Sequence, residues 1–297
     1  MTPTIPRDSV AGQFYNDLRN LAKRNMRDPS EYYTLYALEG FLARLSRSTF
    51  NENLVLKGGV LVGAYSERRL TRDIDLSVTN LPNDMEACES LVRSIAAVDH
   101  EDGLVFDLDA IKGEVIRDES IYSGVRVYVS AHLASANLHF HVDMNFGDPI
   151  FPKPITTALP LLLGGHAEVL AYPLCMLLAE KIVTAIDRGI ANTRWRDFSD
   201  IETIAKTQEV DGSELVAAIE TVCIYRSTVP IPLSRVLEEM PQEAQPKWAI
   251  WRKKQRLENI SPESFHELLL TITRFSDPAI EKRIRGLVWS PNDGVWR

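Results

Sequence analysis

Cysteine, long hydrophobic runs and an apolar leader are all scarce in this 297-residue sequence. The three cysteines, Cys88, Cys175 and Cys223, are odd in number, widely spaced and in apolar surroundings. They therefore predict reduced core thiols, and not a disulfide framework or a metal site. No window approaches 18 consecutive apolar residues, so we expect no membrane span. Residues 1–6 lack the apolar core of a secretory signal, which favours a cytoplasmic protein.

Positive charge is also in short supply. The formal net charge of −8 argues against a generic nucleic-acid-binding protein. The charge is uneven, because residues 243–297 hold ten Lys/Arg against seven Asp/Glu. An acidic body with a mildly basic tail fits selective contact with RNA, although an ordinary charged helical face would explain the tail equally well.

The apolar content of 45% and the charged content of 25% are typical of a globular protein. Strand and helix patterns alternate in the first half, whereas helices dominate beyond about residue 165. The proline-rich segment 151–154 forms a stiff extended connection between them. We therefore predict an α/β protein with a mixed sheet and flanking helices in residues 1–155 and a helical domain in residues 156–297.

The expected elements follow from hydrophobic period and capping signals. An apolar stripe of helical period predicts a second helix over 30–47, with Ser30 and Glu31 as its capped start. The other expected helices cover 8–25, 60–67, 84–98, 173–188, 194 onward, 212–226, 233–239, 243–257, 262–275 and 277–285. The expected strands cover 53–56, 73–78, 104–110, 114–117, 122–131 and 137–146, the last two forming a hairpin.

Two aspartates lie on one face of the strand over 73–78. Apolar residues occupy 74, 76 and 78, so Asp73 and Asp75 share the opposite face with their carboxylates a few ångströms apart. Two carboxylates this close need a positive partner to stay ionised. A divalent cation is the usual partner, and ligands that are all oxygen suit Mg²⁺ or Mn²⁺.

A glycine pair precedes that strand. Lys57, Gly58 and Gly59 follow an apolar run and precede another, which predicts a strand-to-helix turn where backbone can approach a ligand. The helix N-terminus would offer amide groups to phosphate. A phosphate cradle beside metal-binding carboxylates is typical of phosphoryl or nucleotidyl transfer. Arg72, with Arg68 and Arg69, could meet a triphosphate there or be surface charge.

A third acid lies on the later strand over 137–146. Apolar residues occupy 138, 140, 142, 144 and 146, so Asp143 lies on the opposite face with its polar neighbours. It is therefore an acid on a strand face of the same kind as Asp73 and Asp75.

Together these motifs resemble the polymerase β-like nucleotidyltransferases, and Lys57-Gly58-Gly59 with Arg72-Asp73-Ile74-Asp75-Leu76 resembles the AbiEii family of toxins. The resemblance implies that Asp73 and Asp75 hold the metals, and that Asp143 completes the metal site and helps deprotonate the acceptor hydroxyl. It also implies that Lys57, Gly58, Gly59 and Arg72 bind the nucleotide. Gly59 stands where many relatives have Ser or Thr, so no hydroxyl can touch a phosphate there.

Two helical motifs extend the resemblance to residue 201. Lys181 lies in an apolar helix that begins after Pro173, and Asp197 and Asp200 are three residues apart on one face of the next helix. From the residues alone, these acids fit a helix cap and a surface ion pair. The resemblance implies that Lys181 contacts the nucleotide phosphates and that the acids shape the pocket, without saying which of the two acts.

The implied activity is metal-dependent transfer of a nucleoside monophosphate from an NTP to RNA, specifically the tRNA 3′ end. The resemblance further implies a toxin–antitoxin or phage-defence system and a cognate antitoxin. Two alternatives stay open: a small-molecule or protein acceptor, for which the charge of −8 suits a cation, or an inactive binding subunit. In residues 247–256, five basic residues flank Trp248 and Trp251, which could clasp RNA or pack on a neighbouring helix.

Overall fold

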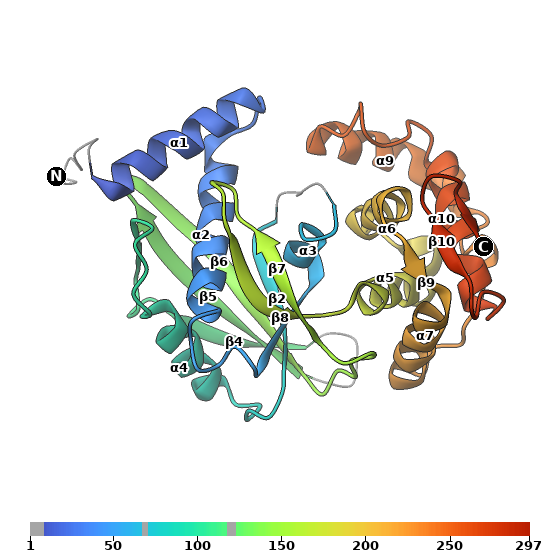
Figure 1. Ribbon diagram of the computed structural model, residues 1–297. Helices are drawn as coiled ribbons and strands as arrows, with labels where there is room; N and C mark the ends of the chain where they lie inside the picture. The colour runs from blue at the N-terminus through green and yellow to red at the C-terminus, as the bar shows by residue number, and fades with distance from the viewer. Residues whose placement is uncertain (1–8, 67–70, 118–122) are drawn as a thin grey trace. The chain divides into compact units, whose positions relative to one another are not determined.

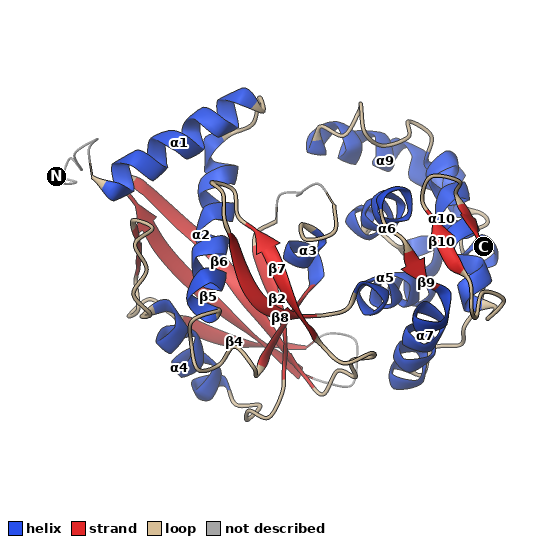
Figure 2. Cartoon of the chain, viewed as in Figure 1, coloured by secondary structure: helices blue, strands red, loops and turns tan. Residues whose placement is uncertain are grey.

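The computed structural model describes residues 9–66, 71–117 and 123–297, and the chain divides into two compact units. Unit 1 comprises Met1–Asp148 and Pro154–Tyr172, and unit 2 comprises Pro149–Lys153 and Pro173–Arg297. Unit 1 holds a large sheet with helices, and unit 2 is mostly helical (Figures 1 and 2). The chain passes into unit 2 near the predicted boundary, returns to unit 1, and leaves it finally after residue 172.

Unit 1 contains four helices and eight strands among the described residues. Its helices are α1 (Val10–Arg24), α2 (Pro29–Leu45), α3 (Gly58–Val62) and α4 (Met85–Ala96). Its strands are β1 (Leu54–Lys57), β2 (Asp73–Val78), β3 (Leu104–Phe106), β4 (Lys112–Arg117), β5 (Ser123–Leu133), β6 (Ala136–Phe146), β7 (Ile155–Pro160) and β8 (His166–Ala171). The β5–β6 hairpin and the bounds of β2 agree with the sequence prediction.

The strands of unit 1 form one mixed sheet in the order β3-β5-β6-β2-β1-β8-β7, with β4 also paired to β5. The pairs β5–β6 and β1–β2 are antiparallel, whereas β2–β6 and β1–β8 are parallel. The sequence did not predict β7 and β8, which complete the edge beyond β1. β7 pairs with β8, and β8 pairs with β1, where Ala171 lies opposite Leu56 from much earlier in the chain.

One face of the sheet packs against α2, which lies along it in Figure 1. Phe41 of α2 meets Phe140 of β6 with ring centroids 6.0 Å apart. The even-numbered apolar residues of β6 therefore face α2, and Asp143 faces the other way. The start of α2 corrects the prediction, because the side chain of Asp28 caps it and Pro29 is its first residue, ahead of Ser30.

Unit 2 contains six α-helices, a short 3₁₀ helix and a small sheet. These are α5 (Leu174–Arg188), η1 (Gly189–Ala191), α6 (Trp195–Thr207), α7 (Gly212–Arg226), α8 (Leu233–Val236), α9 (Met240–Gln255) and α10 (Phe265–Ile280), with strands β9 (Val210–Asp211), β10 (Val288–Ser290) and β11 (Val295–Trp296). The predicted helix over 277–285 was wrong, because α10 continues through Pro278 and turns follow it. The small sheet was not predicted, since its strands are only two or three residues long.

Tryptophans form much of the core of unit 2. Trp289 packs edge-on against Phe275, and Trp248 packs against Phe265. Trp248 is completely buried and stacks on Trp251, which confirms the packing interpretation of this pair. The basic residues of the same helix are therefore the part of the predicted RNA-contact segment that solvent can reach, with Lys253 and Lys254 exposed.

The three cysteines are buried and unpaired, as the sequence predicted. Burial raises the pKa of the Cys88 and Cys223 thiols to about 11, so both remain protonated at neutral pH. None of the helices in the described residues is both long and apolar enough to cross a bilayer.

Candidate active site

The turn between β1 and α3 brings backbone against the carboxylate of Asp75. Lys57, the last residue of β1, lies opposite Asp75 in the antiparallel register. Gly58 follows with φ of +66°, and a Cβ on it would lie 1.9 Å from Oδ2 of Asp75. The N–H of Gly59 donates to the same carboxylate. Only glycine fits at position 58, on grounds of both conformation and space.

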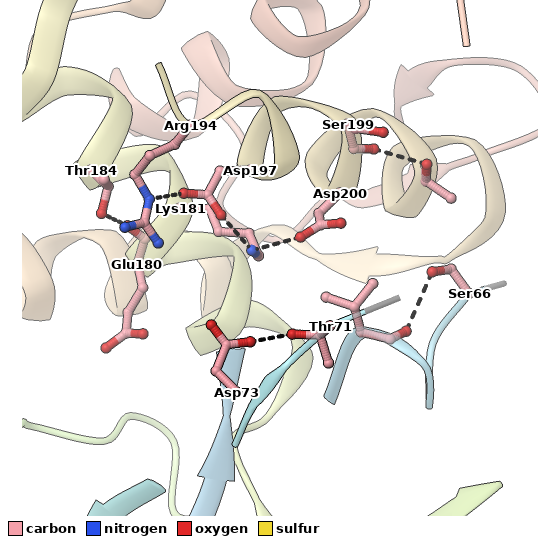
Figure 3. A network of polar contacts seen from close by, with 12 residues as sticks. Ser66, Thr71, Asp73, Glu180, Lys181, Thr184, Arg194, Asp197, Ser199 and Asp200 are labelled. Carbon is pink, nitrogen blue, oxygen red and sulfur yellow. Dashed lines mark hydrogen bonds and ion pairs between the residues drawn. The ribbon is translucent and has the colours of Figure 1, made fainter. Parts of the chain in front are cut away.

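The register of β2 and β6 places the three predicted acids on one face. Asp75 of β2 pairs with Asp143 of β6 in the parallel register, and Asp73 lies two residues before Asp75 on the same strand. Paired residues of adjacent strands point to the same side of a sheet, so all three carboxylates share a face. Asp73 accepts a hydrogen bond from the Thr71 hydroxyl (Figure 3).

Asp143 is held by an arginine that the sequence analysis did not single out. Nε and one terminal nitrogen of Arg126 each donate to an oxygen of Asp143 over 2.7 Å. Arg126 lies opposite Asp143 in the β5–β6 hairpin. The sequence contained a signal for this pair, because a hairpin turn at residues 134 and 135 places residue 126 opposite residue 143. The pair is bidentate, the strongest arrangement of guanidinium and carboxylate.

Negative charge accumulates at Asp75. Burial, together with the neighbouring charges of Asp73 and Asp143, raises the pKa of Asp75 to about 7, although Lys57 opposes the shift. Within the described ranges, no three His, Cys, Asp or Glu side chains are already grouped as a metal site. The donor set nevertheless fits a hard divalent cation, because it consists of carboxylate oxygens that repel one another.

Lys57 lies beside these acids but its ammonium contacts Asp148. The Nζ–Oδ2 distance is 2.5 Å, and both side chains are largely buried. Nζ of Lys57 also lies 5.6 Å from the ring centre of Tyr172. Sequence reasoning missed Asp148, which follows the end of β6 after Gly147. Of the arginines predicted at the mouth, Arg72 is exposed, and Arg68 and Arg69 lie outside the described residues.

The second predicted cluster forms within unit 2. Nζ of Lys181 in α5 donates to both Asp197 and Asp200 of α6, each over 2.8 Å (Figure 3). Nε of Arg194 donates to the other oxygen of Asp197 over 2.6 Å. Lys181 and both aspartates are buried, so this is a buried charge cluster and not the helix cap and surface pair that the residues alone suggested.

The pKa of Asp197 shows how this second cluster is balanced. Burial alone would raise that pKa, but Lys181 and Arg194 outweigh the burial and hold it well below its usual range. Asp197 therefore stays ionised, and both acids fix the position of the lysine ammonium. The sequence left open which of the two acts, and the structure shows that both contact Lys181.

Comparisons with solved structures bear on the fold. MenT4, a nucleotidyltransferase toxin from Mycobacterium tuberculosis H37Rv, matches over 73% of this chain and 74% of its own, with 15% identity and a TM-score of 0.50. That likeness supports the fold. Two Helicobacter pylori chains, one of them JHP933, cover 82% of this chain and 98% and 96% of their own at 12% identity, but their TM-scores of 0.32 and 0.30 carry no argument. No curated protein matches the sequence.

The family comparison covers most of the chain. The model of the AbiEii family, described as a nucleotidyl transferase toxin of a type IV toxin–antitoxin system, matches residues 40–272. That span includes the glycine turn, the three strand acids and the Lys181 cluster. The chain therefore belongs to the AbiEii family and is a nucleotidyltransferase of this toxin type.

Proposed function

We propose that this enzyme transfers a nucleoside monophosphate from an NTP to an RNA acceptor, the tRNA 3′ end, and releases pyrophosphate. The observation that carries the proposal is the shared face of Asp73, Asp75 and Asp143 against the Gly58 turn, where burial and the two neighbouring acids raise the pKa of Asp75. Further acids and closely packed backbone around a strand aspartate are typical of a functional site.

Each residue has a role that its surroundings support. Asp73 and Asp75 would hold Mg²⁺ or Mn²⁺, and such an ion supplies Lewis-acid polarisation of the phosphoryl group. Asp143 completes the set from β6 with its orientation set by Arg126. The turn at Gly58 and Gly59 would bind the nucleotide beside Asp75, with Arg72 and Lys57 as nearby cations.

In the proposed reaction Lys181 would contact the nucleotide phosphates. A buried lysine held by two carboxylates cannot rotate freely, so its ammonium is positioned before substrate binds. Asp197 and Asp200 would shape the pocket by holding this lysine in place. A toxin of this activity requires restraint in its host, and we assign that task to a cognate antitoxin in a toxin–antitoxin or phage-defence system.

The decisive experiment follows label from each of the four α-labelled NTPs, with Mg²⁺, into total tRNA. Asp75→Asn is the test variant, and Asp17→Asn, an exposed acid of α1, is the matched control. We expect label in tRNA from the native chain and from Asp17→Asn, and none from Asp75→Asn. Absence of NTP binding by the native chain would overturn the proposal.

A second acceptor class is included because unit 1 is acidic, with 15 Lys/Arg against 23 Asp/Glu. The same assay is run with small cationic acceptors in place of tRNA. Label only in a small molecule would replace the RNA proposal with a small-molecule nucleotidyltransferase. NTP binding without transfer to either acceptor would favour a binding subunit.

A further inference from the structure

A hollow lies wholly within unit 2, at the loop between α5 and α6. Its volume is about 220 Å³, and η1, the start of α6 and the first half of α9 line it. Four buried residues form its floor: Asn192, Trp195, Met240 and Ala244. A hollow of this size accommodates one small planar ring system, and is smaller than the sites that enclose drug-sized ligands.

Asn192 in that floor has an unused donor. The side chain is 2% exposed, and its Oδ1 accepts from the backbone N–H of Arg194 over 2.8 Å. That backbone bond fixes which end of the amide is oxygen. Nδ2 is buried and finds no hydrogen-bond acceptor anywhere in the described part of the chain. Buried donors are almost always satisfied, so an acceptor atom from outside the chain is expected here.

The rim of the hollow carries one charge of each sign. Glu243 and Lys247 are four residues apart on α9, and both are exposed. Neither forms an ion pair with another residue in the ranges that the structure describes. The rim can therefore accept a hydrogen bond through Glu243 and donate one through Lys247, while apolar side chains supply flat contact area below.

We infer that this hollow binds the nucleobase of a nucleotide. A nucleobase is planar, fits one ring system's volume, and presents donors and acceptors side by side along its edge. Asn192 Nδ2 would donate to a base acceptor and Glu243 would accept from a base N–H. A simple anion site does not fit, because Glu243 lies on the rim and the floor is apolar apart from Asn192.

The hollow connects to the Lys181 cluster through Arg194. Its backbone N–H holds Asn192, and its side chain holds Asp197, which in turn contacts Lys181. A base seated on Asn192 would therefore lie beside the loop that positions the proposed phosphate-binding lysine. This inference rests on the proposed function. In that reaction the base belongs either to the NTP or to the terminal nucleotide of the RNA.

Calorimetric titration of the full chain tests the binding itself. The four nucleosides and ribose 5-phosphate are titrated separately in EDTA, so that no metal-dependent site contributes. We expect at least one nucleoside to bind and ribose 5-phosphate not to bind. Absence of binding by all four nucleosides, or equal binding of ribose 5-phosphate, would overturn the inference.

Asn192→Asp is the sharpest variant, because it keeps the oxygen that accepts from Arg194 and replaces the unused donor with a second carboxyl oxygen. We expect nucleoside affinity to fall at least tenfold. Asn137→Asp, the same change at an exposed site in the β5–β6 hairpin, should leave affinity unchanged. Equal affinity for Asn192→Asp and the native chain would also overturn the inference.

Rim variants cover the case in which Asn192→Asp does not fold. Lys247→Met should weaken nucleoside binding at least threefold, whereas Lys254→Met, an exposed lysine on the same helix outside the hollow, should not. Equal effects of the two lysine variants would overturn the inference, because Lys254 does not line the hollow.

Label-transfer assays then show whether the base in the hollow belongs to the NTP or to the RNA. They also test the base site separately from the proposed function. A changed NTP preference in Asn192→Asp places the donor's base in the hollow, and a raised KM for RNA alone places the acceptor's base there. Native transfer that Asn192→Asp leaves unaltered in both respects would overturn the inference while the proposed function stands. No transfer by the native chain would overturn the proposed function, and the titrations would then decide on the base site alone.

Discussion

Asp75 of unit 1 and Asp197 of unit 2 are both aspartates beside a lysine, yet their pKa values move in opposite directions. Burial and two neighbouring acids raise the pKa of Asp75 to about 7, although Lys57 opposes the shift. Asp197 is buried beside two cations, and its pKa falls well below the usual range. At Asp75 burial and the acids outweigh the nearby cation, whereas at Asp197 the cations outweigh the burial. A cluster that needs a cation is suited to bind one, whereas a neutralised cluster is suited to hold a side chain in place.

The whole units differ in the same sense. Unit 2 holds 18 Lys/Arg and 18 Asp/Glu, whereas all of the net charge of −8 belongs to unit 1. The acidic unit therefore carries the candidate metal site, and the neutral unit carries the lysine cluster and the hollow assigned to a nucleobase. Four predictions test this contrast.

The largest effect is expected from removing the charge of Asp75 in the cluster of Asp73, Asp75 and Asp143. Asp75→Asn should reduce the rate of label transfer by about 10²- to 10⁴-fold, because a metal-bound charge contributes several kcal/mol to a transition state. The rate is measured at saturating NTP, with Asp17→Asn as control. A reduction of less than about tenfold would mean that Asp75 is not a metal ligand.

Breaking the neutral cluster should affect folding. Lys181→Met leaves Asp197 and Asp200 buried without their shared cation, so the free energy of unfolding should fall by about 3–5 kcal/mol. Urea unfolding measures it, with the exposed Lys254→Met as control. Adding Asp197→Asn and Asp200→Asn to Lys181→Met should recover part of the loss. Unchanged unfolding of the single variant would show that the cluster does not contribute to stability.

The glycine turn offers a smaller effect with an internal control. Gly58→Ala should lower the free energy of unfolding by about 2–4 kcal/mol, because it adds both left-handed strain and overlap with Asp75. Gly164→Ala also has a positive φ, of +96°, but its Cβ would meet no atom within 4 Å. Gly164→Ala should lower the free energy of unfolding by about half as much. Equal losses for the two variants would show that the close approach of Gly58 to Asp75 does not affect stability.

The smallest effect concerns pH. The folded pKa of Asp75 lies above that of an unfolded aspartate, so the folded state binds the extra proton and loses stability as pH rises from about 4 to 7. Asp75→Asn removes this loss. In EDTA we expect it to be more stable than the native chain by about 1–3 kcal/mol at pH 8, a range reduced for the partial exposure of the carboxylate, and nearly equal at pH 4. A difference that does not depend on pH would contradict the charge excess.

Local patterns predicted much of unit 1, because strand alternation and glycine punctuation act over a few residues. The bounds of β2 and the shared face of Asp73 and Asp75 followed from a period of two, whereas the position of Asp143 beside them depends on the β2–β6 register. Arg126 and Asp148 were missed because their pairing depends on hairpin register and on the chain after β6. Likewise, Lys181 with its aspartates was recognised by resemblance, but its burial depends on the packing of α5 against α6.

Asn192 shows the same limit more sharply. Nothing in its sequence neighbourhood distinguishes it from an ordinary loop asparagine, because its unused donor becomes visible only when α9, some 50 residues later, closes the hollow. Strands β7 and β8 were missed for a similar reason. Their residues carry ordinary turn and strand propensities, and it is the vacant edge of β1 that makes them part of the large sheet.

The pairing of β1 with β8 also has a consequence for how the protein is made. Leu56, next to the glycine turn, lies opposite Ala171, which leaves the ribosome 115 residues later. At ordinary bacterial-to-eukaryotic elongation rates that interval lasts roughly 6 to 20 s. During it the strand that carries Lys57 has an open edge, so a nascent or prematurely terminated chain ending before β8 has an unfinished sheet. Synthesis itself thus delays completion of the catalytic unit until more than half of the chain has been translated.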